Sequence, residues 1–191
     1  MKFTKMHGAG NDYIYVDCFQ ETTPAEPAEL AKQISDRRFG VGADGLILIL
    51  PTEKADAQMR MFNADGSEAE MCGNGIRCVA KYVYDHGICK QEKLSILTGN
   101  GVLDLSLEID GGKAKLVTVD MGKPILSPPE VPTTISTEPV INHPTRFGDQ
   151  KLSVTCVSMG NPHCVVFVPE ATDELVLGMG PQIETDARFP Q

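Results

Sequence analysis

The chain has 191 residues, 41% of them apolar, and a formal net charge of −9. This length and apolar content suit one or two globular domains with a buried core. The acidic balance, without any basic run, argues against nucleic acid or an anionic membrane as a partner. The longest apolar stretch, 46–50, has only the length of a strand. The N-terminus, Met1–Lys5, lacks the apolar region of a signal peptide, so we expect a cytoplasmic protein.

Short strands with alternating apolar residues dominate the first 120 residues. Glycine-rich turns at 99–101 and 110–112 are typical of hairpins. Helices are predicted at 27–38 and at roughly 73–86, with Gly87 closing the second. This mixture predicts an α+β fold. The expected strands are 13–16, 46–50, 58–62, 94–97, 102–109 and 114–119.

The last third of the chain carries signs of a boundary and of a repeat. Residues 124–144 are rich in Pro, Thr and Ser, which is typical of an extended connection or an edge strand near a domain boundary. Asp36-Arg37-Arg38-Phe39 returns as Asp186-Ala187-Arg188-Phe189, an offset of 150. At the same offset, Asn11 and Asn161 each precede an expected strand, the second at 164–168. The shared order favours a duplicated domain.

Six cysteines occupy positions 18, 72, 78, 89, 156 and 164. None forms a Cys-x2-Cys pair, so we expect free thiols in a reducing compartment and no metal site. Cys72 and Cys78 lie about 240° apart around a helix and should not pair. All except Cys72 are interpreted as unreactive small residues in or near the core.

Cys72 stands where a polar loop gives way to the helix expected at 73–86. The positive end of the helix dipole favours a thiolate at this position. The unpaired N–H groups of Gly73 and Asn74 beside it can hold a carboxylate. This short segment therefore offers both a base and an anion-binding site.

Two familiar motifs fit the sequence poorly. Residues 40–45 match Gly-x-Gly-x-x-Gly, but the expected helix precedes them and a strand follows, the reverse of a dinucleotide-binding fold. We interpret this segment as a helix C-cap that turns into a strand. Cys72 and Arg77 are one residue too close for the phosphate loop of a cysteine phosphatase. A thiol phosphatase is therefore a weak alternative.

Glycine-containing loops hold Asn11, Asn63, Asn74 and Asn161. Each loop alone is typical of an ordinary turn, because Gly and Asn tolerate positive φ. His163 alone is typical of a satisfied histidine at a strand end. Taken together, the neutral amides can donate to a carboxylate and accept from an ammonium group. This pattern favours a zwitterionic amino acid as the ligand.

The segments 5–12, 63–68, 71–78 and 160–164 closely resemble the diaminopimelate epimerase family, in the family's order. The resemblance implies two similar domains, each a strand barrel wrapped round a central helix, with the active site between them. We place the first domain at 1–120 and the start of a truncated second domain at 121–191. The implied reaction is the interconversion of LL- and meso-diaminopimelate in lysine and peptidoglycan precursor biosynthesis. It also implies a homodimer for the complete protein and no cofactor.

The family's functional residues carry over by position. Cys72 matches the first catalytic cysteine, and Gly73 and Asn74 match residues that bind the α-carboxylate of the substrate. Inverting an α-carbon requires two acid–base groups on opposite faces of that carbon. By the family pattern, the second group is a cysteine in a later Ala-Cys-Gly-(Thr/Ser)-Gly motif. The remaining matches are the substrate contacts Asn11, Asn63 and Asn161, and a histidine that assists the chemistry, His163.

Two departures from the family pattern matter. Many members carry Gln where this chain has Gly45, and the second cysteine motif is absent from these 191 residues. Neither Cys156 nor Cys164 precedes a glycine-rich helix start. We therefore expect the chain to be inactive alone. The alternatives are another cofactor-independent amino-acid racemase or isomerase of this fold, or a non-catalytic amino-acid-binding module. Proline racemase-like enzymes typically have His where this chain has Asn74, which argues against that group.

Overall fold

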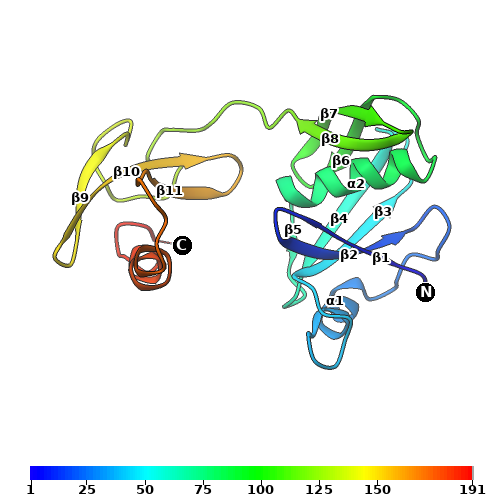
Figure 1. Ribbon diagram of the computed structural model, residues 1–191, viewed down its shortest axis with the longest axis horizontal. Coiled ribbons are helices and arrows are strands. Elements are labelled where there is room, and N and C mark those ends of the chain that lie inside the picture. The colour runs from blue at the N-terminus through cyan, green and yellow to red at the C-terminus, as the bar shows by residue number, and fades with distance from the viewer. Residues whose placement is uncertain (191) are drawn as a thin grey trace. The chain divides into compact units, whose positions relative to one another are not determined.

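The computed structural model describes residues 1–190, which divide into two compact units with the boundary between Met121 and Gly122 (Figure 1). The first unit contains an eight-stranded sheet and the second a three-stranded sheet. Each has its own buried apolar cluster. None of the helices in this part of the chain is long and apolar enough to cross a membrane.

The sheet of the first unit runs in the order β1-β2-β3-β4-β6-β7-β8, with β5 paired to β4. Two neighbouring pairs, β2 with β3 and β4 with β6, are parallel, and the other pairs are antiparallel. The strands are β1 Thr4–Gly8, β2 Asn11–Asp17, β3 Gly45–Leu50, β4 Ala57–Asn63, β5 Glu68–Ala69, β6 Lys93–Thr98, β7 Gly101–Asp110 and β8 Lys113–Val119.

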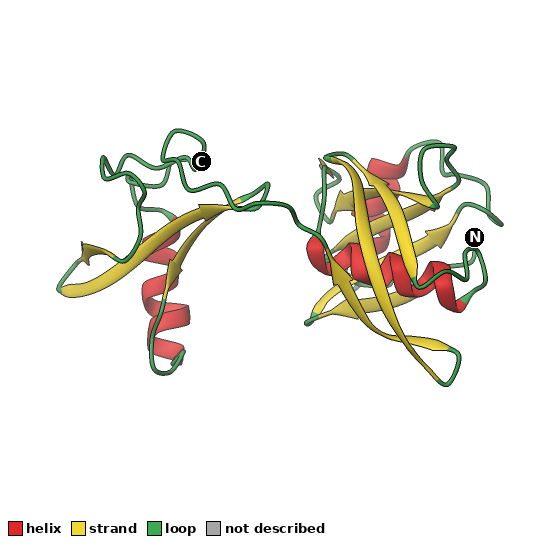
Figure 2. Cartoon of the chain, turned by 90° about the horizontal axis from the view of Figure 1, so that it is seen from above, coloured by secondary structure: helices red, strands yellow, loops and turns green. Residues whose placement is uncertain are grey.

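Helix α2, Gly73–Asp85, lies inside this sheet. It contacts β1, β2, β4, β6, β7 and β8, and Figures 1 and 2 show the sheet curling around it. The face made by Ile76, Val79, Ala80 and Val83 is completely buried, as its spacing predicts. The α+β class, with strands wrapped round a central helix, is therefore confirmed in the first unit.

Helix α1, Pro27–Ser35, covers the outer face of β2, β3 and β4. Strand β3 is therefore buried on both faces, with Ile47 toward α2 and Leu46 toward α1, which explains its unbroken apolar sequence. The predicted helix end at Arg38 is three residues too late. Asp36 leaves the helical conformation, and its carboxylate accepts the N–H groups of Arg38 and Phe39, each at 2.7 Å.

The six strands expected in this unit are all present, each within one or two residues of its predicted ends. Strands β1 and β5 were not among them. The short β1 pairs with β2 through a hairpin at Ala9 and Gly10, which both have positive φ. β5 has only two residues, too few to leave an alternating pattern in the sequence.

The second unit contains a sheet in the order β11-β10-β9, followed by a π-helix and a short α-helix. The strand expected at 164–168 lies two residues earlier. Residues 124–142 form no strand or helix beyond one bridge between Ile125 and Ser158, and Val131, Ile135 and Val140 are buried in the core of this unit. The elements are β9 His143–Phe147, β10 Gln150–Ser158, β11 Pro162–Val166, η1 Glu174–Met179 and α3 Gly180–Glu184.

The segments that suggest a repeat have similar local structure in the two units. Asp36 and Asp186 both follow a helix and accept the backbone N–H two residues ahead. Asn11 and Asn161 both follow a glycine with positive φ in a hairpin between antiparallel strands. The duplication itself stays a prediction.

Candidate active site

Cys72 is the N-cap residue of α2. Its backbone is extended, with φ −138° and ψ 114°, and its carbonyl accepts the first helical hydrogen bond from Ile76 at 2.9 Å. The Sγ atom accepts the N–H of Gly75 at 3.3 Å. The thiol therefore takes the place that a serine or aspartate oxygen usually occupies at a helix start. The N–H groups of Gly73 and Asn74 point out of the first turn, where a helix has no partner of its own for them.

Glycine at position 75 allows the start of the helix to pack closely. A Cβ at this position would lie 2.8 Å from Cδ1 of Ile47 on β3 and 3.6 Å from the Sγ of Cys72. A Cβ on Gly8, at the end of β1, would lie 2.8 Å from the carbonyl oxygen of Asn74. Gly75 on the helix and Gly8 on β1 thus allow the start of α2 to lie against two strands of the sheet.

Asn11, at the start of β2, links Cys72 to a carboxylate. The Cys72 thiol donates to Oδ1 of Asn11 across 3.4 Å, and Nδ2 of Asn11 donates to Oδ2 of Asp44 at 2.7 Å. The same Oδ2 accepts the backbone N–H of Asp12 at 3.0 Å. Sequence reasoning missed Asp44, which it treated only as part of a turn.

Asp44 also belongs to a charged cluster. Nη2 of Arg37 lies 2.7 Å from Oδ1 of Asp12 and 2.8 Å from Oδ1 of Asp44, and Nζ of Lys5 lies 3.0 Å from Asp12. The Arg37 guanidinium, with help from Lys5, holds the pKa of the Asp12 carboxyl well below its usual range. Both carboxylates are therefore compensated by nearby cations.

Asn63 lies at the end of β4, directly opposite Gly45 in the sheet. Its Nδ2 donates to Oγ of Ser67 at 3.0 Å, and the next residue, Ala64, donates its N–H to the carbonyl of Asp44 at 2.9 Å. Since β2 pairs with β3 and β3 with β4, Asn11, Asp44 and Asn63 lie at one end of three neighbouring strands.

Position 45 has no room for a side chain on this backbone. A Cβ there would overlap the carbonyl oxygen of Phe62 and lie 2.8 Å from Cε1 of Tyr13. The Gln that many family members carry therefore cannot be accommodated here without a shift of β3 or β4. Any contact that this chain makes from position 45 comes from the backbone.

Two of the three acidic residues before Cys72, Asp65 and Glu68, have side-chain partners of their own. Glu68 forms a two-pronged ion pair with Arg60 at 2.7 and 2.9 Å, and Asp65 accepts from the N–H and hydroxyl of Ser67. The carbonyl of Glu70 accepts the N–H of Gly99, at the tip of the β6–β7 hairpin, at 2.9 Å. These contacts fix the path of the chain into Cys72.

Asn161 and His163 belong to the second unit. Asn161 is exposed in the β10–β11 turn, where its carbonyl accepts the N–H of Met159 at 3.3 Å. His163 is exposed on β11 and lines a cavity of about 260 Å³ together with Thr133, Glu184 and others. Of the sequence-predicted residues, Asn11, Asn63, Cys72, Gly73 and Asn74 lie in the first unit, all half-buried.

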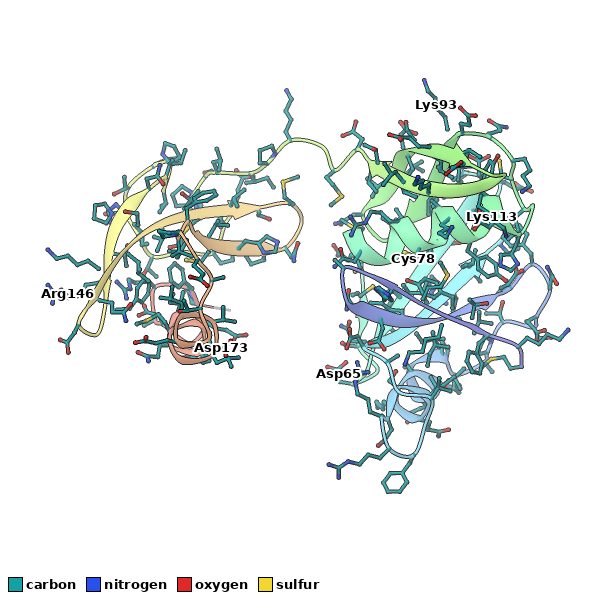
Figure 3. All side chains as sticks on the ribbon, viewed as in Figure 1. Asp65, Cys78, Lys93, Lys113, Arg146 and Asp173 are labelled. Atoms are coloured by element: carbon teal, nitrogen blue, oxygen red, sulfur yellow. The ribbon has the colours of Figure 1, made fainter. Side chains whose placement is uncertain are left out.

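The other cysteines lie in less reactive surroundings, and all six are free. Figure 3 shows Cys78 on α2 inside the curled sheet, where burial raises the pKa of its thiol. Burial likewise raises the pKa of Cys18 and Cys156, and that of Cys164 to about 11. Only Cys72 combines partial exposure with a helix N-terminus.

The chain is similar to several known proteins. The diaminopimelate epimerase family model matches residues 3–127. Over all 191 residues the chain is 52% identical to the diaminopimelate epimerase of Acetivibrio thermocellus and spans 68% of it. A Bacillus anthracis phenazine biosynthesis protein has the same fold, with a TM-score of 0.59, 20% identity, and coverage of 87% of this chain and 56% of that one. A hydroxyproline epimerase from Agrobacterium vitis gives a TM-score of 0.56, 16% identity, and coverage of 86% and 50%.

Proposed function

This chain belongs to the diaminopimelate epimerase family, and from that premise we propose that Cys72 is one of two acid–base groups that interconvert LL- and meso-2,6-diaminopimelate without a cofactor. The observation that supports this most directly is the position of its Sγ at the N-terminus of α2, between the N–H of Gly75 and the amide of Asn11. The substrate is a small amino acid.

Inversion at an α-carbon requires a proton to leave one face and another to arrive on the opposite face. The Cys72 thiolate takes the proton on its side in one direction of the reaction, and the Cys72 thiol delivers it in the other. By the family pattern, a second cysteine serves the opposite face. Since its motif is absent from these 191 residues, the chain alone does not turn over substrate.

The electrons left on the α-carbon delocalise into the adjacent carboxylate, so negative charge grows there as the proton leaves. The N–H groups of Gly73 and Asn74 at the start of α2 bind this carboxylate and stabilise the added charge. The side-chain amide of Asn74 is held by Arg77, whose Nη2 donates to its Oδ1 at 2.5 Å, so its NH2 group can act as a further donor.

The remaining contacts recognise the rest of the substrate. Neutral amides can pair with both its ammonium and its carboxylate groups, and they place no further charge beside the thiol. His163 assists the proton transfers, and its exposure on β11 leaves its ring accessible to a ligand. We assign the amide contacts to Asn11, Asn63 and Asn161.

The test uses this chain alone and this chain joined to the part of the Acetivibrio thermocellus relative that it does not span. Chiral chromatography follows LL- and meso-diaminopimelate, and mass spectrometry follows deuterium entering the α-carbon from deuterated water. We expect both signals from the joined protein and neither from the 191-residue chain or from a joined Cys72→Ala variant. Cys78→Ala, which removes a buried thiol from the same helix, is the matched control and should remain active.

Several outcomes would contradict the proposal. Substantial turnover by the joined Cys72→Ala protein would remove Cys72 from the chemistry. Turnover by the 191-residue chain would show that a second cysteine motif is not required. Binding of diaminopimelate by the joined protein without any exchange at the α-carbon would favour a non-catalytic binding module.

The cellular setting is also part of the proposal. Six free thiols, one of them required as an acid–base group, suit the reducing cytoplasm. The family pattern supports a homodimer for the complete protein. Sedimentation of the joined protein at micromolar concentration checks this, and a monomer there would contradict it.

A further inference from the structure

The side-chain amide of Asn11 lies between Asp44 and Cys72, and the Tyr13 side chain lies close to both Asn11 and Cys72. One side of the amide faces Oδ2 of Asp44 at 2.7 Å, and the other faces Sγ of Cys72 at 3.4 Å. An ionised carboxylate has no hydrogen to donate, so the group facing Asp44 must be the NH2. The carbonyl oxygen of the amide is thereby directed at Cys72.

This orientation distinguishes the two protonation states of Cys72. An amide oxygen accepts a hydrogen bond from a thiol and offers none to a thiolate. If the amide turned over, its NH2 would instead donate to the thiolate and stabilise it. The N–H of Gly75 remains on the other side of the sulfur in either case.

Asp44 is itself held in place. Its Oδ2 accepts from Asn11 and from the backbone of Asp12, while its Oδ1 pairs with Nη2 of Arg37 at 2.8 Å. Its own carbonyl accepts the N–H of Ala64 at the end of β4. The carboxylate therefore has little freedom to release the amide.

We propose that Asp44 is a positioning residue that fixes the amide of Asn11 with its oxygen toward Cys72, so that this oxygen accepts the hydrogen of the thiol. The inference rests on the proposed function for its catalytic meaning, because an epimerase with two bases needs one of them protonated when the substrate binds. The geometry concerns Cys72 directly, so its test does not require turnover.

The experiment measures alkylation of Cys72 in the 191-residue chain by iodoacetamide at fixed pH, resolved by peptide mass spectrometry. Only the thiolate reacts. Asp44→Ala frees the amide to turn and donate to the sulfur, so we expect Cys72 to react about fivefold faster, the size of one reversed hydrogen bond. Cys89 serves as the internal reference in the same digest, and circular dichroism confirms that each variant is folded.

Three further variants separate orientation from charge. Asp12→Ala removes the same charge from the same cluster but leaves the contact between Asp44 and Asn11, so the rate should change less than about twofold. Asp44→Asn should restore the original rate, because one amide oxygen can accept from both groups that now share Oδ2. In an Asn11→Ala background, Asp44→Ala should have no further effect.

The outcomes are distinct from those of the proposed function. Equal acceleration by Asp44→Ala and Asp12→Ala, or no rescue by Asp44→Asn, would show a charge effect and overturn the positioning role. Unchanged alkylation in Asp44→Ala would also overturn it, while leaving the epimerase proposal intact. Conversely, retained turnover in Cys72→Ala would refute the epimerase assignment without affecting the alkylation result.

Discussion

Replacing Cys72 by serine should stabilise the protein while removing the thiol at the start of α2. The Sγ atom caps α2 by accepting the N–H of Gly75 at 3.3 Å, and an oxygen accepts such a bond better than a sulfur. A serine hydroxyl can also donate to Asn11 as the thiol does. Cys72→Ala, by contrast, leaves the N–H of Gly75 without a side-chain partner.

The magnitude follows from the value of an N-cap. Loss of a good cap costs about 1 kcal/mol, and a sulfur cap is worth about half of that. We therefore expect Cys72→Ser to raise the free energy of unfolding by about 0.5 kcal/mol and Cys72→Ala to lower it by a similar amount. The resulting difference of about 1 kcal/mol corresponds to roughly 4 °C in Tm.

Urea unfolding followed by circular dichroism measures this difference as a shift in midpoint at constant slope. Cys78→Ser is the matched control, because it makes the same change on the same helix at a site that is 6% exposed. There the buried hydroxyl should cost about 1–2 kcal/mol. A Cys72→Ser protein no more stable than Cys72→Ala would refute the capping argument.

Further expected outcomes follow from burial and charge. Gly45→Ala should cost about 2 kcal/mol in urea unfolding, because its Cβ would overlap the carbonyl of Phe62; an unchanged midpoint would contradict this. Arg188 lowers the pKa of Asp186 to about 2, so the stability from this pair is present above about pH 4 and is lost as the pH falls toward 2. The Asp186→Asn variant should therefore have a lower free energy of unfolding at neutral pH, and this free energy should fall less as the pH is lowered. Parallel curves of unfolding free energy against pH for the variant and the unchanged protein would contradict this. With its pKa near 11, Cys164 should be alkylated about tenfold faster per pH unit from 8 to 10, and a plateau below pH 10 would contradict the effect of burial.

Local patterns in the sequence predicted the parts of the fold that depend on local physics. The apolar face of α2 and the thiol at its start follow from residue spacing and from the polar loop before it. The unbroken run 46–50 predicted a strand, and its burial on both faces follows from α1 covering the outer side. The alternation of Leu152, Val154 and Cys156 in β10 was also available in the sequence and is the signal that would have predicted that strand.

The role of Asp44 could not be predicted in this way. Residue 11 comes beside residue 44 only because β2 and β3 pair in parallel, with α1 and a loop between them. Such a pairing has no local signature, since it depends on which strands become neighbours in the finished sheet. The Gly-rich loop at 40–45 leads into β3 as predicted, but it is not the helix C-cap that was expected there, because the C-cap of α1 is Asp36. That prediction gave no reason to look at the single carboxylate of the loop.

The hairpin tip at Gly99 has a consequence for how this protein tolerates change. Surface turns are usually where insertions, tags and sequence drift are accepted. Here a Cβ on Gly99 would lie 2.7 Å from Cα of Glu70, two residues before Cys72. An insertion in this turn would therefore displace the backbone that leads into the reactive thiol. Insertions are better placed in the Asp110–Gly112 turn, where a Cβ on either glycine would meet nothing within 4 Å, and Gly111 and Gly112 should be kept because both have positive φ.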